Sequence, residues 1–308
     1  RAELRISNDK EFYKRGEEQL FRLDDGGVGG LKPYSRDDGW QPLNIWGMGI
    51  ASHDVTGDGY PEYYLTNMTD NRFEVLADGP ARPAYNDKAK AFGIEAGFPF
   101  IGGDKKPSTA WHAEFGDVNN DGLADLLVVK GNVETVGFVA DADPNNLLIQ
   151  QPGGTFKEGA KEAGVISFEL GRSGALTDLN LDGHLDLVVT NRFAPVELWR
   201  NTSAAGNWLK LKLVQPGGNA RAVGAWVEVR TKAGTQRREL TIGGGHGGGQ
   251  WGWLHFGLAD AGSAEVRVQW PGGEWGAWAK VKANQFASLT RGKTGAIHWN
   301  PPLNKNRE

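Results

Sequence analysis

The sequence predicts an all-β protein in two parts: β-propeller-type blades that form an incomplete propeller, followed by an antiparallel β-sandwich domain. Three observations predict this fold. A nine-residue loop rich in Asp, Asn and Gly occurs three times, and a short run that favours a β-strand follows each copy. From Asn207 onward, apolar and polar residues alternate with a period of two, as in strands with one buried face. The 45 glycines and 12 tryptophans among 308 residues also suit a turn-rich β protein.

The three loops, residues 54–62, 117–125 and 178–186, share one pattern of oxygen-bearing residues. Side-chain oxygens stand at places one, three, five and nine, and glycine stands at place six. Such a ring of oxygens around a sharp turn suits a hard cation, and place seven contributes its main-chain carbonyl. We therefore predict up to three Ca²⁺ ions. The candidate ligands are Asp54, Thr56, Asp58, Tyr60, Glu62, Asp117, Asn119, Asp121, Leu123, Asp125, Asp178, Asn180, Asp182, His184 and Asp186.

Place twelve distinguishes these loops from EF-hands, which need a bidentate Glu there and a helix on each side. Here place twelve holds Leu65, Val128 and Val189, and each lies in a β-rich run. The cation would therefore clamp a turn between two strands. The alternative that the turns hold no ion stays open, above all in the first loop, where Thr56 replaces Asn and Glu62 replaces Asp.

The loops begin at residues 54, 117 and 178, so the repeat spans first 63 and then 61 residues. That length suits one four-stranded propeller blade with a long connection. A second motif keeps the same period, since the segment 89–94 is echoed by 160–165. Together with the small-residue strands that enter the loops, at 46–51, 111–116 and 171–176, the repeats resemble the FG-GAP/VCBS repeats of integrin-like β-propellers.

The alternating C-terminal region predicts half-buried antiparallel strands. Leu209, Leu211 and Leu213 fall on one face, with Lys210 and Lys212 opposite. The segments 207–209, 223–225, 236–239, 255–258 and 270–273 together resemble the ASPIC/UnbV domain, which follows FG-GAP repeats in the cartilage acidic protein family. Together the two resemblances span most of the chain and imply a cartilage acidic protein-like protein, although that family usually carries more blades than this sequence has.

Four predicted segments follow: an N-terminal partial blade (1–43), the FG-GAP/VCBS calcium-binding blades (44–203), the ASPIC/UnbV-like β-sandwich (204–292) and an extended tail (293–308). A weak helix is expected at 11–15 and a turn at 24–27. Propellers usually need at least four blades to close, so another element or another chain must cover the open strand edges. The chain begins at Arg1, and we hypothesise that a leader or a larger N-terminal part has been removed.

Composition limits the classes of function. The 34 basic and 38 acidic residues give a net charge of −4 without long blocks of either sign, which excludes nucleic acid as an expected partner. The chain has no cysteine, and this excludes thiol catalysis but allows export. No run has the ~18 apolar residues that a transmembrane segment needs. Because extracellular modules use such calcium sites, we expect an extracytoplasmic protein, either periplasmic or secreted.

We predict no catalytic residues and no enzyme. The glycine tract 243–249 lacks the Lys-Ser/Thr ending of a phosphate-binding loop, so a flexible sandwich loop is expected there. His112 shares a predicted strand with Glu114, and a packed strand histidine is favoured over a functional one. Ser173 lies in a segment that lacks the second glycine of a nucleophile elbow.

The expected function is therefore that of a calcium-stabilised binding or scaffold protein that mediates protein–protein interaction as an extrinsic subunit of a larger assembly. A protein partner would cover the open blade edges, and a membrane-associated complex is one candidate for it. The alternative is a calcium-dependent enzyme or a lectin that acts on carbohydrate or lipid. A pocket with two carboxylates not claimed by calcium would favour the enzyme, and only the tryptophan count supports the lectin.

Overall fold

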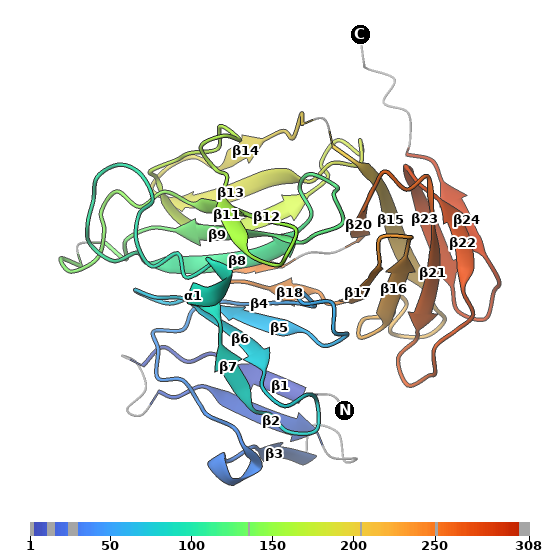
Figure 1. Cartoon of the computed structure of the whole chain (residues 1–308), viewed down its shortest axis with the longest axis horizontal. Coiled ribbons are helices and arrows are strands. Elements are labelled where there is room, and N and C mark those ends of the chain that lie inside the picture. Colours follow the sequence, from blue (N-terminus) through green and yellow to red (C-terminus); the bar gives the residue numbers. More distant parts are fainter. Residues whose placement is uncertain are drawn as a thin grey trace.

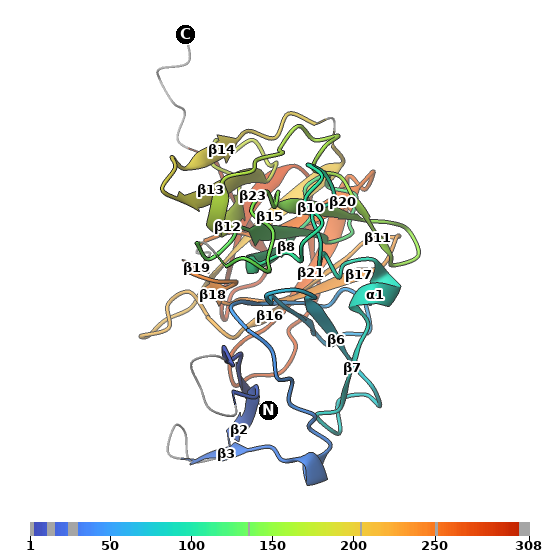
Figure 2. The same cartoon turned by 90° about the vertical axis from the view of Figure 1, so that its left-hand side faces the viewer.

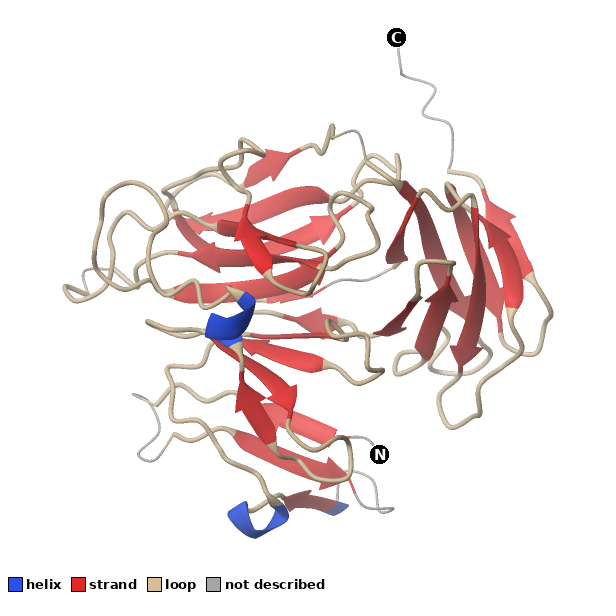
Figure 3. Cartoon of the chain, viewed as in Figure 1, coloured by secondary structure: helices blue, strands red, loops and turns tan. Residues whose placement is uncertain are grey.

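The chain is all-β (Figures 1 and 3), with one short α-helix, α1 (Ala89–Phe92), and one 3-10 helix (Arg36–Asp38) in its described part. The computed structural model describes residues 3–10, 16–23, 30–134, 136–203, 205–249 and 252–301. The helix predicted at 11–15 and the turn at 24–27 lie outside these ranges. No helix within them is long and apolar enough to cross a membrane.

Four antiparallel sheets follow one another in chain order and stack from the bottom to the top of Figure 1. The first sheet has three strands, β1 (Glu3–Ile6), β2 (Gln19–Leu23) and β3 (Leu31–Pro33). The second has β4 (Ile50–His53), β5 (Glu62–Leu65), β6 (Arg72–Leu76) and β7 (Tyr85–Asp87). The third has β8 (Ala110–Gly116), β9 (Asp125–Lys130), β10 (Asn146–Gln150) and β11 (Phe156–Glu158). The fourth has β12 (Leu170–Thr177), β13 (Asp186–Arg192) and β14 (Glu197–Trp199).

Strand β9 explains how the stack is held together, because it is buried on both faces. Leu126 and Val128 enter the core shared with the second sheet, whereas Leu127 and Val129 enter the core shared with the fourth. Successive side chains of a strand point to opposite faces, so a continuous apolar run is what a sheet between two others requires. The first strands of these three sheets, β4, β8 and β12, lie next to one another.

The C-terminal domain packs two four-stranded sheets face to face (right side of Figure 1). One sheet has the order β20 (Leu254–Ala259), β15 (Asn207–Val214), β23 (Gln285–Thr290) and β24 (Ala296–Trp299). The other has the order β17 (Thr235–Glu239), β16 (Trp226–Arg230), β21 (Ser263–Gln269) and β22 (Ala279–Lys282). The predicted apolar face of β15 is confirmed, since Leu209, Leu211 and Leu213 are all in the core between the sheets.

Two details of this domain differ from the prediction. Strand β23 pairs with β15 in parallel, so the sandwich is not wholly antiparallel. Strand β24 lies in the predicted extended tail and pairs with β23 in an antiparallel register, as the edge strand of the sheet. The prediction of a tail is therefore wrong for residues 296–299, and residues 302–308 lie outside the described ranges.

The glycine tract forms a hairpin of β18 (Gly243–Gly244) and β19 (Gly248–Gly249), and the expected flexible loop is wrong here. This glycine hairpin leaves the sandwich and enters the stack of the four N-terminal sheets, which we call the blade stack. There β18 contacts β4 and β19 contacts β12 (Figure 2). The Gly245 amide donates to the Ile50 carbonyl at 2.9 Å. A hairpin from the second domain thus completes a ring of neighbours around β4, β8 and β12.

Candidate metal loops and the interdomain cavity

Each candidate metal loop connects the first and second strands of one sheet and ends on the first residue of the second strand. The three loops have the same backbone, with a left-handed residue at place four and a left-handed glycine at place six. The φ values are 74°, 58° and 61° at Gly57, Asn120 and Leu181, and 92°, 91° and 92° at Gly59, Gly122 and Gly183. A leucine rarely adopts this conformation, so the rest of the third loop must impose it.

The loops also share their internal hydrogen bonds. The place-one carboxylate accepts the amide of the place-six glycine, at 3.0, 2.8 and 2.9 Å in the three loops. The place-nine carboxylate accepts the amide of place two, at 2.7, 2.9 and 3.0 Å. The place-five carboxylate accepts the amide of place seven. The structure therefore brings the predicted carboxylates of each loop around one turn.

No ion pair among the described residues neutralises the buried carboxylates of the first two loops, and Arg237 and Arg238 act on Asp54 and Asp117 only from a distance. Burial raises the pKa of Asp125 to about 8 and, with the neighbouring Asp121 carboxylate, the pKa of Asp117 to about 7. Burial likewise raises the pKa of Glu62 to about 7, and Asp54 Oδ1 is buried without a hydrogen-bond partner. Like charges this close repel one another, so the donor sets of these loops fit a cation.

The third loop differs because the protein supplies its own cations. Lys210 Nζ lies 2.9 Å from Asp178 Oδ2, and the two side chains are only 4% and 2% exposed. Arg200 lies 3.3 Å from Asp182. Lys210 was expected opposite the core face of β15. It does point away from that core, but the blade stack covers it there. A cation in this loop would have to compete with the Lys210 ammonium group.

No group of three or more Asp, Glu or His side chains among the described residues has the arrangement of a metal site. Calcium binding accordingly remains a prediction, and the first two loops fit it better than the third.

All three loops contact the sandwich domain. Arg237 donates to the Gly59 carbonyl in the first loop at 2.8 Å. In the second loop, His255 Nε2 lies 2.7 Å from Asn120 Oδ1, and the Ala259 amide donates to the Asn120 carbonyl at 2.9 Å. Lys210 makes the contact with the third. These contacts could not be predicted from the sequence, because they join residues more than thirty positions apart that share no motif.

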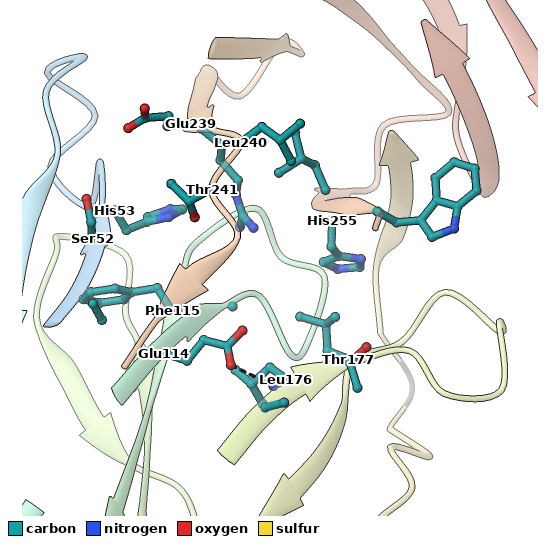
Figure 4. A pocket seen from close by; sticks show the side chains of 18 of the residues that line it. Ser52, His53, Glu114, Phe115, Leu176, Thr177, Glu239, Leu240, Thr241 and His255 are labelled. Atoms are coloured by element: carbon teal, nitrogen blue, oxygen red, sulfur yellow. Dashed lines mark hydrogen bonds between the residues drawn. The ribbon is translucent and has the colours of Figure 1, made fainter. Parts of the chain in front are cut away.

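A cavity of about 460 Å³ lies between the blade stack and the sandwich. Its walls come from the first strands of three sheets, from β17 and β20, and from the glycine hairpin. Figure 4 shows His53, Glu114, Thr177 and His255 around this shared space, each from a different strand. Arg238 on β17 also lines it. The sequence prediction placed none of these residues together.

His112, also in the wall, is a packed strand histidine, as expected, and is 2% exposed. The His246 amide at the tip of the glycine hairpin donates to His112 Nδ1 at 3.1 Å. Because Nδ1 accepts, the proton of the neutral ring is on Nε2, which lies 3.7 Å from Glu114 Oε2. Burial raises the pKa of Glu114, whose Oε2 also accepts the Leu176 amide. His112 therefore joins the glycine hairpin to the cavity.

Comparison with known proteins adds one relationship. Residues 215–296 match the family model described as ASPIC and UnbV, and this range includes the glycine hairpin and Arg238. The resemblance noted for the C-terminal sandwich is thereby supported. No curated protein matches the chain.

Proposed function

We propose that the chain is a calcium-stabilised extracytoplasmic scaffold protein. In this proposal its blades are FG-GAP/VCBS repeats that precede the ASPIC/UnbV domain, as in cartilage acidic protein-like proteins. One observation carries the proposal: three loops with the same backbone and the same hydrogen bonds, each in contact with the sandwich. Because the three loops have the same geometry and each contacts the sandwich, we infer that all three loops help to join the two domains.

Calcium would be held by the fifteen predicted residues, five in each loop. The residue at place seven would bind through its main-chain carbonyl oxygen, and the residues at places one, three, five and nine through their side-chain oxygens. When bound, it supplies the positive charge that the buried carboxylates of the first two loops lack. The residues of the chain do the rest. Asp117 holds its own turn through the Gly122 amide at 2.8 Å, and Asn120 presents its carbonyl and its side chain to the sandwich.

An open strand edge supports the role as a scaffold. The fourth sheet has three strands, and β14 pairs only with β13 in the part of the chain that is described. Near this edge Val196, Leu198 and Phe193 are exposed, and Phe193 is 85% exposed. Unpaired amides and carbonyls beside exposed apolar side chains are a site for adding a strand from another chain. A protein partner would cover this edge. In that arrangement this chain is an extrinsic subunit, and the partner belongs to a larger assembly, either membrane-associated or soluble.

The proposal is tested by chemical cross-linking and size exclusion in calcium. The protein should capture a partner or a second copy, and Leu198→Lys on β14 should weaken the capture. Ile297→Lys on β24, a residue 58% exposed against 62% for Leu198, is the matched control and should change nothing. A monomer that yields no cross-linked species in calcium would remove the basis for a scaffold.

A second candidate is a calcium-dependent enzyme or lectin that acts on carbohydrate or lipid. The interdomain cavity favours it, because Glu114 and Glu239 line the cavity and neither belongs to a candidate metal loop. Turnover of glycoside or lipid ester substrates by the purified chain, or binding on a glycan array, would select this candidate over the scaffold.

A further inference from the structure

The interdomain cavity gathers polar atoms that the protein leaves unsatisfied. Among the described residues, His255 Nδ1 and Arg238 Nε are buried without a hydrogen-bond partner, and His112 Nε2 faces Glu114 Oε2 at 3.7 Å, beyond hydrogen-bond distance. The two histidines are 4% and 2% exposed, respectively. Folded proteins leave few such groups, and each requires an explanation such as a bound molecule. Two such groups around one cavity indicate a ligand site.

Arg238 is the most unusual of these residues. Among the described residues it forms no ion pair, and its Nε is buried without a hydrogen-bond partner. Its guanidinium carbon lies 5.2 Å from the centre of the Phe256 ring, and Glu114 and Asp117 act on it only from a distance. Burial lowers the pKa of Arg238 to about 10, and the group remains charged at neutral pH. It is surrounded by protein yet keeps some accessible surface, because it lines the cavity.

Other basic residues nearby already have partners. Arg230 on the adjacent strand lies 2.8 Å from Glu265, and Arg237 donates to Gly59. Lys210 is paired with Asp178. Removing one partner from a buried ion pair is strongly unfavourable, so a buried guanidinium without a partner calls for an anion from outside. Arg238 is therefore a basic residue of the cavity that has no anionic partner within ion-pair distance among the described residues.

We propose that the cavity binds a small organic carboxylate of sugar-acid or amino-acid size, with its carboxylate on Arg238 and its polar body against His112 and His255. A planar guanidinium matches a carboxylate through two parallel hydrogen bonds. The volume lies in the range of small-molecule sites. This site does not rest on the proposed scaffold role, but it adjoins the candidate metal loops, because Asp54 and Asp178 also line the cavity.

The remaining walls narrow the class of ligand. Four acidic side chains line the cavity and would repel a doubly charged anion such as phosphate more strongly than a singly charged carboxylate: Asp54, Glu114, Asp178 and Glu239. Phe115, Trp226 and Phe286 give the walls an apolar part that suits a carbon skeleton. Ser52, Glu239 and Thr241 are exposed and lie on one side of the cavity (Figure 4), where a ligand can enter.

Calorimetry with D-glucuronate, L-glutamate and D-lactate tests the proposal, with D-glucose and inorganic phosphate as controls. At least one carboxylate should bind in a 1:1 ratio and more tightly than either control. Arg238→Gln should weaken that binding by about 10- to 100-fold, because a charge-assisted bond is lost. Arg230→Gln, on the neighbouring strand, should leave it unchanged. Binding of none of the carboxylates, or equal binding to Arg238→Gln, would overturn the proposal.

A second measurement needs no variant and covers the case in which Arg238→Gln fails to fold. Phenylglyoxal modifies accessible arginines, and mass spectrometry locates the modified residue. The carboxylate that binds should slow modification of Arg238 in the wild-type protein, and D-glucose should not. Modification of Arg238 at the same rate with and without every carboxylate would equally overturn the proposal.

Discussion

Replacing Gly245 with alanine tests how the glycine hairpin is held in the blade stack. The added methyl group would lie 2.1 Å from His112 Nδ1 and 2.3 Å from its Cε1, and Gly245 has a φ of 60°. A left-handed alanine costs about 1–2 kcal/mol. Crowding against a buried ring costs about 1–3 kcal/mol more. We therefore expect the free energy of unfolding to fall by about 2–5 kcal/mol.

Thermal unfolding followed by circular dichroism measures this loss. At about 2–4 °C per kcal/mol for a domain of this size, the melting temperature should fall by roughly 4–20 °C. Hydrogen exchange provides a local check, because the Gly245 amide donates to the Ile50 carbonyl at 2.9 Å. If the hairpin leaves the stack in the variant, exchange at residue 245 should accelerate.

Gly243→Ala is the matched control within the same hairpin. Its methyl group would have no atom within 4 Å, and its φ is not in the left-handed region. We expect no loss of stability from it, since alanine in an ordinary strand conformation restricts the unfolded chain. Equal melting temperatures for the 245 and 243 variants would refute the insertion of the hairpin between β4 and β12.

Three further predictions test other contacts. Lys210→Met should destabilise the protein by about 3–5 kcal/mol in chelator, because Asp178 is left buried and unpaired. The loss should be smaller in calcium, and Lys212→Met is the control. Equal losses of stability in both buffers would argue against a cation site in the third loop. Gly257→Ala would place a methyl group 1.8 Å from Asp117 Oδ2 and should weaken calcium binding in calorimetry, whereas Gly218→Ala, with no atom within 4 Å, should not. Burial raises the pKa of Glu74 despite its ion pair with Arg5, so the folded state holds a proton that the unfolded state releases. That contribution is fully present below about pH 4.5 and is lost as the pH rises through the folded pKa, so Glu74→Gln should gain stability relative to the wild type as the pH rises above about 4.5 in urea denaturation. A difference that does not change with pH would contradict this assignment.

Local patterns predicted the strands and the loops well. The alternation in β15 identified Leu209, Leu211 and Leu213 as core residues, and they are all buried. The apolar run of β9 follows the repeated loop and fills two cores at once. These features depend on periodicity and on turn chemistry, which neighbouring residues determine.

Contacts between the two domains could not be predicted from local patterns. A period of two shows which side chains share a face, but it does not show what covers that face, so Lys210 was expected opposite the core and is instead buried against the third loop. The glycine tract has no side chains to reveal a partner, and its place beside β4 depends on Ile50, nearly two hundred residues earlier. The cavity and Arg238 depend on both domains and had no sequence signal.

Calcium dependence of the melting temperature tests the central claim most directly. At calcium about tenfold above the dissociation constant, each occupied loop should add about 1.4 kcal/mol. The wild type should melt at a higher temperature in calcium than in chelator. Asp121→Ala should lower the melting temperature in calcium and change it far less in chelator, and Asp260→Ala, an exposed aspartate outside the loops, should match the wild type in both. Equal melting temperatures of the wild type with and without chelator would contradict the account.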